Sequence, residues 1–204
     1  MRVGVMGGVF NPPHLGHVIC ACEALDQMRL DVVRLVPARR PPHRAVEPEP
    51  GADVRAELCE QAIAGLARLE VSRLELEREG GPSYTIDTLR AMHDASPEDE
   101  LFLVLGADQA RALASWREPG EVAQISTLVV AEREGAGREA VRDALAGLGT
   151  EAEYLDMPRI GISSTLVRGR VGASRPYRHL VPGGVADLID ERGLYASFAP
   201  GAAV

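Results

Sequence analysis

Short apolar runs alternate with helix-patterned segments along most of this chain, and this alternation restricts the fold more than any other feature. The runs RVGVM (2–6), VVRLV (32–36) and LFLVL (101–105) have the continuous apolar character of strands buried on both faces. Strands that alternate with helices need crossover connections. The pattern therefore predicts an α/β protein with a doubly wound, mostly parallel sheet.

The end of the chain departs from this pattern, because two helical segments follow each other there without a strand between them. We expect one domain over 1–204, with an α/β core over about 1–160, a small C-terminal helical appendage over about 161–195 and a frayed tail over 197–204. The expected strands are 2–6, 32–36, 69–78, 101–105, 127–131 and 152–155. The expected helices are 14–29, 53–67, 85–93, one after Ala107, 137–147, 163–171 and 182–192.

Charge and composition exclude several classes of function. A net charge of −8 argues against binding to nucleic acid or to an anionic membrane. All 22 basic residues are arginine, which excludes Schiff-base chemistry and a P-loop lysine. Three cysteines (Cys20, Cys22 and Cys59) without paired spacing suggest reduced thiols. With no long apolar run and no signal-peptide pattern, we expect a cytoplasmic protein.

The segment that follows the first expected strand, MGGVFNPPHLGHVICACEA (6–24), is rich in special residues. Gly7 and Gly8 allow close approach of a ligand to the backbone, and a helix that starts near His14 directs free N–H groups at an anion. His14 and His17 are spaced to share one face of the first helical turn. This arrangement predicts a phosphate site at the carboxyl end of the first strand.

Other interpretations of the same segment are weaker. The glycines do not form the GxGxxG pattern of dinucleotide-binding proteins, and the histidines lack the spacing of a zinc pair on a helix. Two surface histidines in a capping turn remain an open alternative on these residues alone.

Two motifs resemble those of a known superfamily. GGVFNPPHLGH (7–17) is similar to the GxFDPxHxGH pattern of the HxGH nucleotidyltransferases, and ISSTLVR (162–168) resembles their ISSTxxR element. Class I aminoacyl-tRNA synthetases share the first motif but need a lysine-rich loop that this chain lacks. Four further segments resemble nicotinate mononucleotide adenylyltransferases, namely PPHR (41–44), SYTIDTL (83–89), LGADQARALASW (105–116) and RHLVPGGVADLIDERGLY (178–195).

The resemblance implies a Rossmann-like nucleotidyltransferase fold and an activity. The expected enzyme transfers the adenylyl group of ATP to nicotinate mononucleotide, releasing pyrophosphate, as a step of NAD biosynthesis. A pantetheine-phosphate adenylyltransferase, or a nucleotide-binding sensor without catalysis, is the alternative. Homo-oligomerisation stays open.

Residue roles follow from the same resemblance. His14, His17 and Arg168 are the expected catalytic residues, with His17 neutralising developing charge. The expected ATP site contains Gly7, Gly8, Val9, Phe10, His14, His17, Gly106, Asp108, Ile162, Ser163, Ser164 and Arg168. The expected mononucleotide site contains Asn11, His43, Arg44, Ser83, Tyr84, Thr85 and Trp116.

Two positions depart from the family pattern. Val9 replaces threonine or serine, and Asn11 replaces aspartate. The second change removes a carboxylate that could assist magnesium, so no residue is assigned as a metal ligand. Mg²⁺ is expected to arrive with ATP and to bind mainly phosphate oxygens.

Overall fold

The sheet forms the centre of the molecule and is parallel throughout its described pairings. The computed structural model describes residues 1–42, 50–78, 80–132, 137–158 and 160–198. Six strands lie in the order β3-β2-β1-β4-β5-β6. They are β1 (Arg2–Gly8), β2 (Val32–Pro37), β3 (Leu69–Val71), β4 (Glu100–Gly106), β5 (Thr127–Glu132) and β6 (Ala152–Asp156). The doubly wound parallel sheet expected from the sequence is confirmed.

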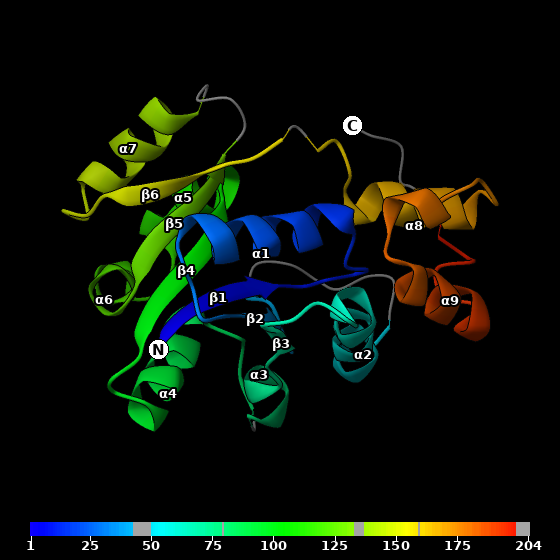
Figure 1. The fold of residues 1–204 in the computed structure, drawn as a ribbon, viewed down its shortest axis with the longest axis horizontal. Helices are drawn as coiled ribbons and strands as arrows, with labels where there is room; N and C mark the ends of the chain where they lie inside the picture. Colours follow the sequence, from blue (N-terminus) through cyan, green and yellow to red (C-terminus); the bar gives the residue numbers. More distant parts are fainter. Residues whose placement is uncertain (43–49, 79, 133–136, 159, 199–204) are drawn as a thin grey trace.

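Helices cover both faces of this sheet (Figure 1). Alternate strand residues feed two separate buried clusters, so that Met6 belongs to one and Val5 to the other. The first face is covered by α1 (Leu15–Gln27) and α2 (Ala52–Ile63). The opposite face is covered by α4 (Thr85–Ala95), α5 (Ala107–Ala112), α6 (Pro119–Ile125) and α7 (Arg138–Ala146). Within the described residues, no helix has the length and apolar character needed to cross a membrane.

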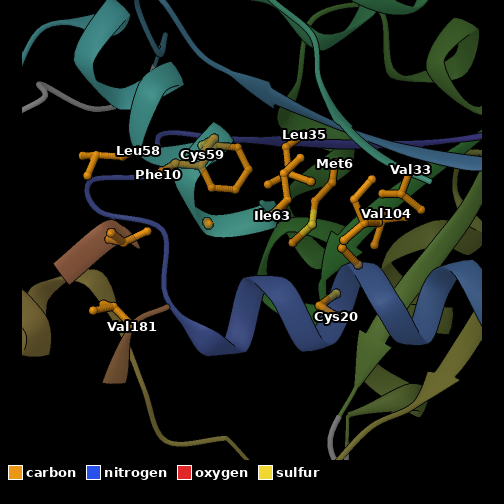
Figure 2. Close-up of a cluster of buried hydrophobic side chains, with 14 of the residues drawn as sticks. Met6, Phe10, Cys20, Val33, Leu35, Leu58, Cys59, Ile63, Val104 and Val181 are labelled. Carbon is orange, nitrogen blue, oxygen red and sulfur yellow. The ribbon is translucent and has the colours of Figure 1, made fainter. Parts of the chain in front are cut away.

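The C-terminal part consists of helices, as expected, and lies beyond one end of the sheet (Figure 1). Its elements are α8 (Ser164–Gly172), the 3-10 helix η2 (Arg178–Leu180) and α9 (Gly183–Arg192). The last of these packs against α2. Figure 2 shows Phe10, from the loop after β1, beside Leu58 and Cys59 of α2, with Val181 of the C-terminal part in the same cluster. The C-terminal part is thus joined to the main core by apolar packing.

One expected strand is shorter than predicted. The segment 69–78 was expected to be extended, but pairing with β2 ends at Val71, and Leu74–Glu77 forms a short helix, α3. The alternating sequence LELE fits a period of two residues, which favours a strand in isolation. In the helical turn, Glu75 is buried next to Thr88 of α4, and the Thr88 hydroxyl donates a hydrogen bond of 2.7 Å to its carboxylate. After β4, the chain forms α5 and then the 3-10 helix η1 (Leu113–Ser115).

Candidate active site

A large cavity opens at the carboxyl ends of the central strands. It has a volume of about 890 Å³ and lies where β1 and β4 are neighbours. From β1 the chain crosses to one side of the sheet, and from β4 it crosses to the other, so this is the switch point where doubly wound folds bind ligands. Its lining includes all but two of the residues assigned to the expected site. The exceptions, His43 and Arg44, lie outside the described residues.

The loop after β1 forms the floor of the cavity. No atom lies within 4 Å of the place that a Cβ would occupy on Gly7, so the backbone there faces open space. A Cβ on Gly8 would come within 3.0 Å of the Phe10 ring, which folds back over that residue. The ring of Phe10 itself is buried in the core, although the residue also borders the cavity. Glycine at these two positions therefore keeps the backbone accessible and lets the loop close up.

His14 and His17 lie together at the start of α1. His14 is the N-cap, and the two ring centroids are 3.8 Å apart. The backbone N–H of His14 donates a hydrogen bond to Nδ1 of His17 at 3.1 Å. An imidazole nitrogen that accepts a hydrogen bond carries no proton, so the ring proton of His17 lies on Nε2.

Both imidazoles are held in the neutral form. Burial lowers the pKa of His14 to about 4. Burial and, second, repulsion from His14 lower the pKa of His17 to about 3. Adding a second proton to His17 would also break the hydrogen bond from the His14 backbone. His17 is therefore suited to donate a neutral hydrogen bond to phosphate, whereas full charge neutralisation was expected from the sequence.

The N-terminus of α8 lies on the same cavity and carries the second motif. Ser163 caps the helix, since its hydroxyl accepts the N–H of Leu166 at 3.1 Å. Ser164 donates its hydroxyl to the carbonyl of Pro12 at 2.8 Å. Arg168 donates through Nη1 to the carbonyl of Asn11 at 2.6 Å. These contacts join the two motifs, about 150 residues apart in sequence, into one wall. That wall presents a helix N-terminus and a guanidinium, both suited to phosphate.

Aromatic and polar groups from α4, α5 and the end of η1, which cover the opposite face of the sheet, also line the cavity and define its second end. Trp116 follows η1, and Tyr84 is the N-cap of α4 without a side-chain hydrogen bond to the helix. Thr85 begins that helix, so the N-terminus of α4 borders the cavity. Asp108 stands at the start of α5 with a side chain that is 95% exposed and paired with Arg111. This end offers a ring surface, helix N–H groups and a carboxylate.

Ser83 has a supporting role in the structure. Its hydroxyl accepts hydrogen bonds from the backbone N–H groups of Arg39 and Arg40, at 3.0 and 3.2 Å. Its own N–H donates to the carbonyl of Arg40 at 2.7 Å. Ser83 thus fixes the start of the segment after β2 to the entrance of α4.

Sequence reasoning missed three buried residues that shape the site. Arg55 of α2 is only 1% exposed and donates to the carbonyls of Val9 and Ala38, both at 2.7 Å. Glu75 borders the cavity, and burial raises the pKa of its carboxyl group. Tyr195, from the C-terminal part, donates its hydroxyl to Oδ1 of Asn11. Tyr195 ends the segment 178–195 that resembles the family, but that resemblance gave it no role, and the partners of Arg55 and Tyr195 lie 46 and 184 residues away.

Comparison with known proteins agrees with this geometry. A family model described as cytidylyltransferase-like matches residues 5–170. A protein of Thermus thermophilus named "Probable nicotinate-nucleotide adenylyltransferase" is 41% identical over 195 residues, which cover 96% of this chain and 100% of the relative. One of the same name from Geobacillus thermodenitrificans is 37% identical, covering 96% of this chain and 87% of the relative. The chain belongs to the cytidylyltransferase-like family, and within it to the nicotinate-nucleotide adenylyltransferases.

Solved structures show the same fold. The nicotinic acid mononucleotide adenylyltransferase of Plasmodium falciparum, complexed with NaAD, superposes with a TM-score of 0.76 at 17% identity. That match covers 97% of this chain and 98% of the other. The chain therefore has the Rossmann-like nucleotidyltransferase fold, and membership of the family makes it a nucleotidyltransferase.

Proposed function

We propose that this protein transfers the adenylyl group of ATP to nicotinate mononucleotide, giving nicotinate adenine dinucleotide and pyrophosphate. The observation that carries the proposal is one cavity lined by chemically different groups from the two faces of the sheet. His14, His17 and the α8 wall suit a polyphosphate, while Trp116 and the start of α4 suit an aromatic acid. The relatives that cover nearly the whole chain carry names with the same activity.

In the proposed reaction, a phosphate oxygen of the mononucleotide attacks the α-phosphorus of ATP. A new P–O bond forms, and the bond from the α-phosphorus to the bridging oxygen of the β-phosphate breaks, so that pyrophosphate leaves with the bonding electron pair. Such a transfer depends on positioning and on electrostatic stabilisation. His17 donates Nε2–H to a phosphoryl oxygen, and Arg168 with the N-terminus of α8 receives the leaving β- and γ-phosphates.

The acceptor end supplies the choice of substrate. The pyridine ring stacks on Trp116, and the carboxylate of nicotinate accepts N–H groups at the start of α4, near Tyr84 and Thr85. The amide of the nicotinamide analogue would turn its own NH₂ toward these donors and leave buried hydrogens unpaired, at a typical cost of about 1 to 3 kcal/mol. Loss of charge-assisted hydrogen bonds adds to this difference.

Magnesium fits this site as a companion of ATP. In the described part of the chain, no group of three or more histidine, cysteine, aspartate or glutamate residues could hold a metal ion. Asn11 offers no carboxylate, and its Oδ1 already accepts from Tyr195. We propose that phosphate oxygens and water provide most ligands of Mg²⁺, which would offset charge on the phosphates.

A pyrophosphate-release assay with ATP and three separate acceptors tests the proposal. The acceptors are nicotinate mononucleotide, nicotinamide mononucleotide and phosphopantetheine. We expect kcat/KM for the acid to exceed that for the amide by at least about a hundredfold, since each 1.4 kcal/mol corresponds to roughly tenfold. Preference for phosphopantetheine would favour the alternative adenylyltransferase. Nucleotide binding without turnover on any acceptor would favour a sensor.

A further inference from the structure

The loop between β1 and α1 is held from the C-terminal side of the chain by three hydrogen bonds. Ser164 and Arg168 supply two of them, to the carbonyls of Pro12 and Asn11. The third comes from Tyr195, whose hydroxyl donates to Oδ1 of Asn11 at 2.7 Å. Tyr195 lies beyond the residues matched by the family model. It is not among the residues that line the cavity, and its hydrogen bond to Asn11 joins it to a residue that is.

Both partners of this third bond are enclosed. Tyr195 is 4% exposed and Asn11 is also 4% exposed. A hydrogen bond between buried groups is costly to break, because the acceptor left behind finds no water. The bond therefore fixes the Asn11 side chain firmly, and Asn11 borders the cavity between Phe10 and the histidine pair.

Tyr195 and Phe10, the residue before Asn11, adopt unusual backbone conformations. Tyr195 has a φ of 64° and Phe10, next to Asn11, has a φ of 50°. Both lie in the left-handed region, which bulky residues with a Cβ seldom enter. Such conformations persist only where the surroundings impose them, and they gather at functional sites. Residues with strained backbone conformations thus occur at Tyr195 and directly before Asn11.

We infer that Tyr195 is a positioning residue for adenylyl transfer, holding Asn11 and with it the β1–α1 loop in the geometry that the reaction requires. The inference rests on the proposed function for its kinetic test. Because transfer depends on placing the phosphates to a fraction of an ångström, loosening this loop lowers turnover more than it lowers acceptor binding.

Tyr195→Phe is the variant that tests this role, because it removes the hydroxyl and keeps the ring in the core. We expect kcat to fall by about tenfold to a hundredfold, the scale of a small misplacement of reacting groups. The KM for nicotinate mononucleotide should change by less than kcat, within about threefold, because Asn11 is the one residue of the expected mononucleotide site that loses a contact, whereas Trp116 and Tyr84 keep theirs.

Tyr177→Phe is the matched control. Tyr177 is a second buried tyrosine of the C-terminal part, but its hydroxyl donates to Asp190 at 2.5 Å and also lies 3.3 Å from the carbonyl oxygen of Ala186. Its loss should leave kcat within about twofold at a temperature where all variants are folded. If Tyr195 only stabilised the fold, both variants would keep their kcat.

Combination with Asn11 substitutions shows whether the tyrosine acts through that residue. In an Asn11→Ala background, Tyr195→Phe should cause no further loss of kcat beyond about twofold. In an Asn11→Asp background, which keeps an acceptor oxygen, the loss should remain about tenfold or more. An equal loss in the alanine background, or a Tyr195→Phe kcat within twofold of the parent, overturns the inference.

Two further measurements cover the remaining outcomes. If Tyr195→Phe does not fold, Asn11→Asp should retain at least about ten times the kcat of Asn11→Ala, and equal activity of the two overturns the inference. If the parent protein uses no mononucleotide as acceptor, the proposed function fails. The positioning role is then tested by measuring the binding of α,β-methylene ATP. Its dissociation constant should rise at least about threefold in Tyr195→Phe and stay unchanged in Tyr177→Phe. Equal dissociation constants in the parent and both variants overturn the inference.

Discussion

The backbone N–H of His14 donates to Nδ1 of His17 at 3.1 Å, and this bond decides which protons the active site carries. It places the single ring proton of His17 on Nε2. A second ring proton on His17 would lie on Nδ1 and point at the backbone N–H of His14. Protonation of His17 would therefore break this hydrogen bond at the start of α1. We therefore expect Arg168 to supply positive charge to the site and His17 to supply a directed hydrogen bond.

The first prediction concerns stability against pH. The pKa values of His14 and His17 are about 4 and about 3 in the folded chain, below the ordinary value of 6.5. As the pH falls, the unfolded chain therefore takes up protons first. Stability contributed by the neutral imidazoles is complete above pH 6.5 and declines as the pH drops toward 4.

Urea unfolding at pH 7.5, 6.5 and 5.5 measures this decline. Each imidazole contributes a slope of up to about 1.4 kcal/mol per pH unit below 6.5. Removing one imidazole with His17→Ala should reduce the slope by roughly half. An identical slope in the parent and in this variant would show that His17 titrates normally.

The second prediction separates the two nitrogens of His17. His17→Ala should lower kcat by about 100-fold to 1,000-fold, the usual loss for one preorganised donor. Glutamine can place its NH₂ near the position of Nε2, whereas asparagine can place its oxygen near Nδ1. His17→Gln should therefore keep more turnover than His17→Ala, and His17→Asn should keep helix stability but not turnover.

Steady-state pyrophosphate release gives the kcat values, and thermal unfolding gives the stabilities. An alanine variant within threefold of the parent would exclude His17 as a catalytic donor. An asparagine variant more active than the glutamine variant would place the active proton on the other nitrogen.

The sequence predicts the sheet and the phosphate end of the site because both depend on local patterns. Strand runs such as 101–105 are continuous and apolar, and the His14 and His17 spacing fixes a shared helix face. Local alternation fails at 74–77, where the chain forms a helical turn and Glu75 accepts a hydrogen bond from Thr88, a tertiary contact that the two-residue period does not include. Arg55 and Tyr195 could not be assigned, since their partners are 46 and 184 residues away.

The third prediction concerns Arg55. Its guanidinium joins the carbonyls of Val9 and Ala38, and so holds the loop after β1 against the segment after β2. Arg55→Met keeps most of the side-chain volume but leaves these carbonyls without that donor, each at a cost of about 1 to 3 kcal/mol. We expect the free energy of unfolding to fall by about 2 to 6 kcal/mol in urea titrations.

Arg73→Met serves as its control. Arg73 pairs with Glu60 and Asp53 at the surface of the molecule. Exposed ion pairs contribute little, so this variant should unfold close to the parent. Equal destabilisation of the two variants would mean that the buried hydrogen bonds of Arg55 contribute no more to the free energy of unfolding than the exposed ion pairs of Arg73.

The last prediction tests the acceptor end through Trp116. A stacked aromatic ring typically contributes about 1 to 3 kcal/mol, so Trp116→Ala should raise the KM of both the acid and the amide mononucleotide by about tenfold or more. The dissociation constant of an ATP analogue should stay nearly unchanged, because we expect ATP to be held by His14, His17 and Arg168, which line the cavity from α1 and α8. Trp116→Phe keeps an aromatic face and should stay within about threefold of the parent in KM. Calorimetry gives the dissociation constant of the ATP analogue, and steady-state kinetics gives the KM of each mononucleotide. If the alanine variant weakens ATP as much as the mononucleotides, Trp116 stacks on adenine, and the two substrates occupy the cavity in the reverse orientation.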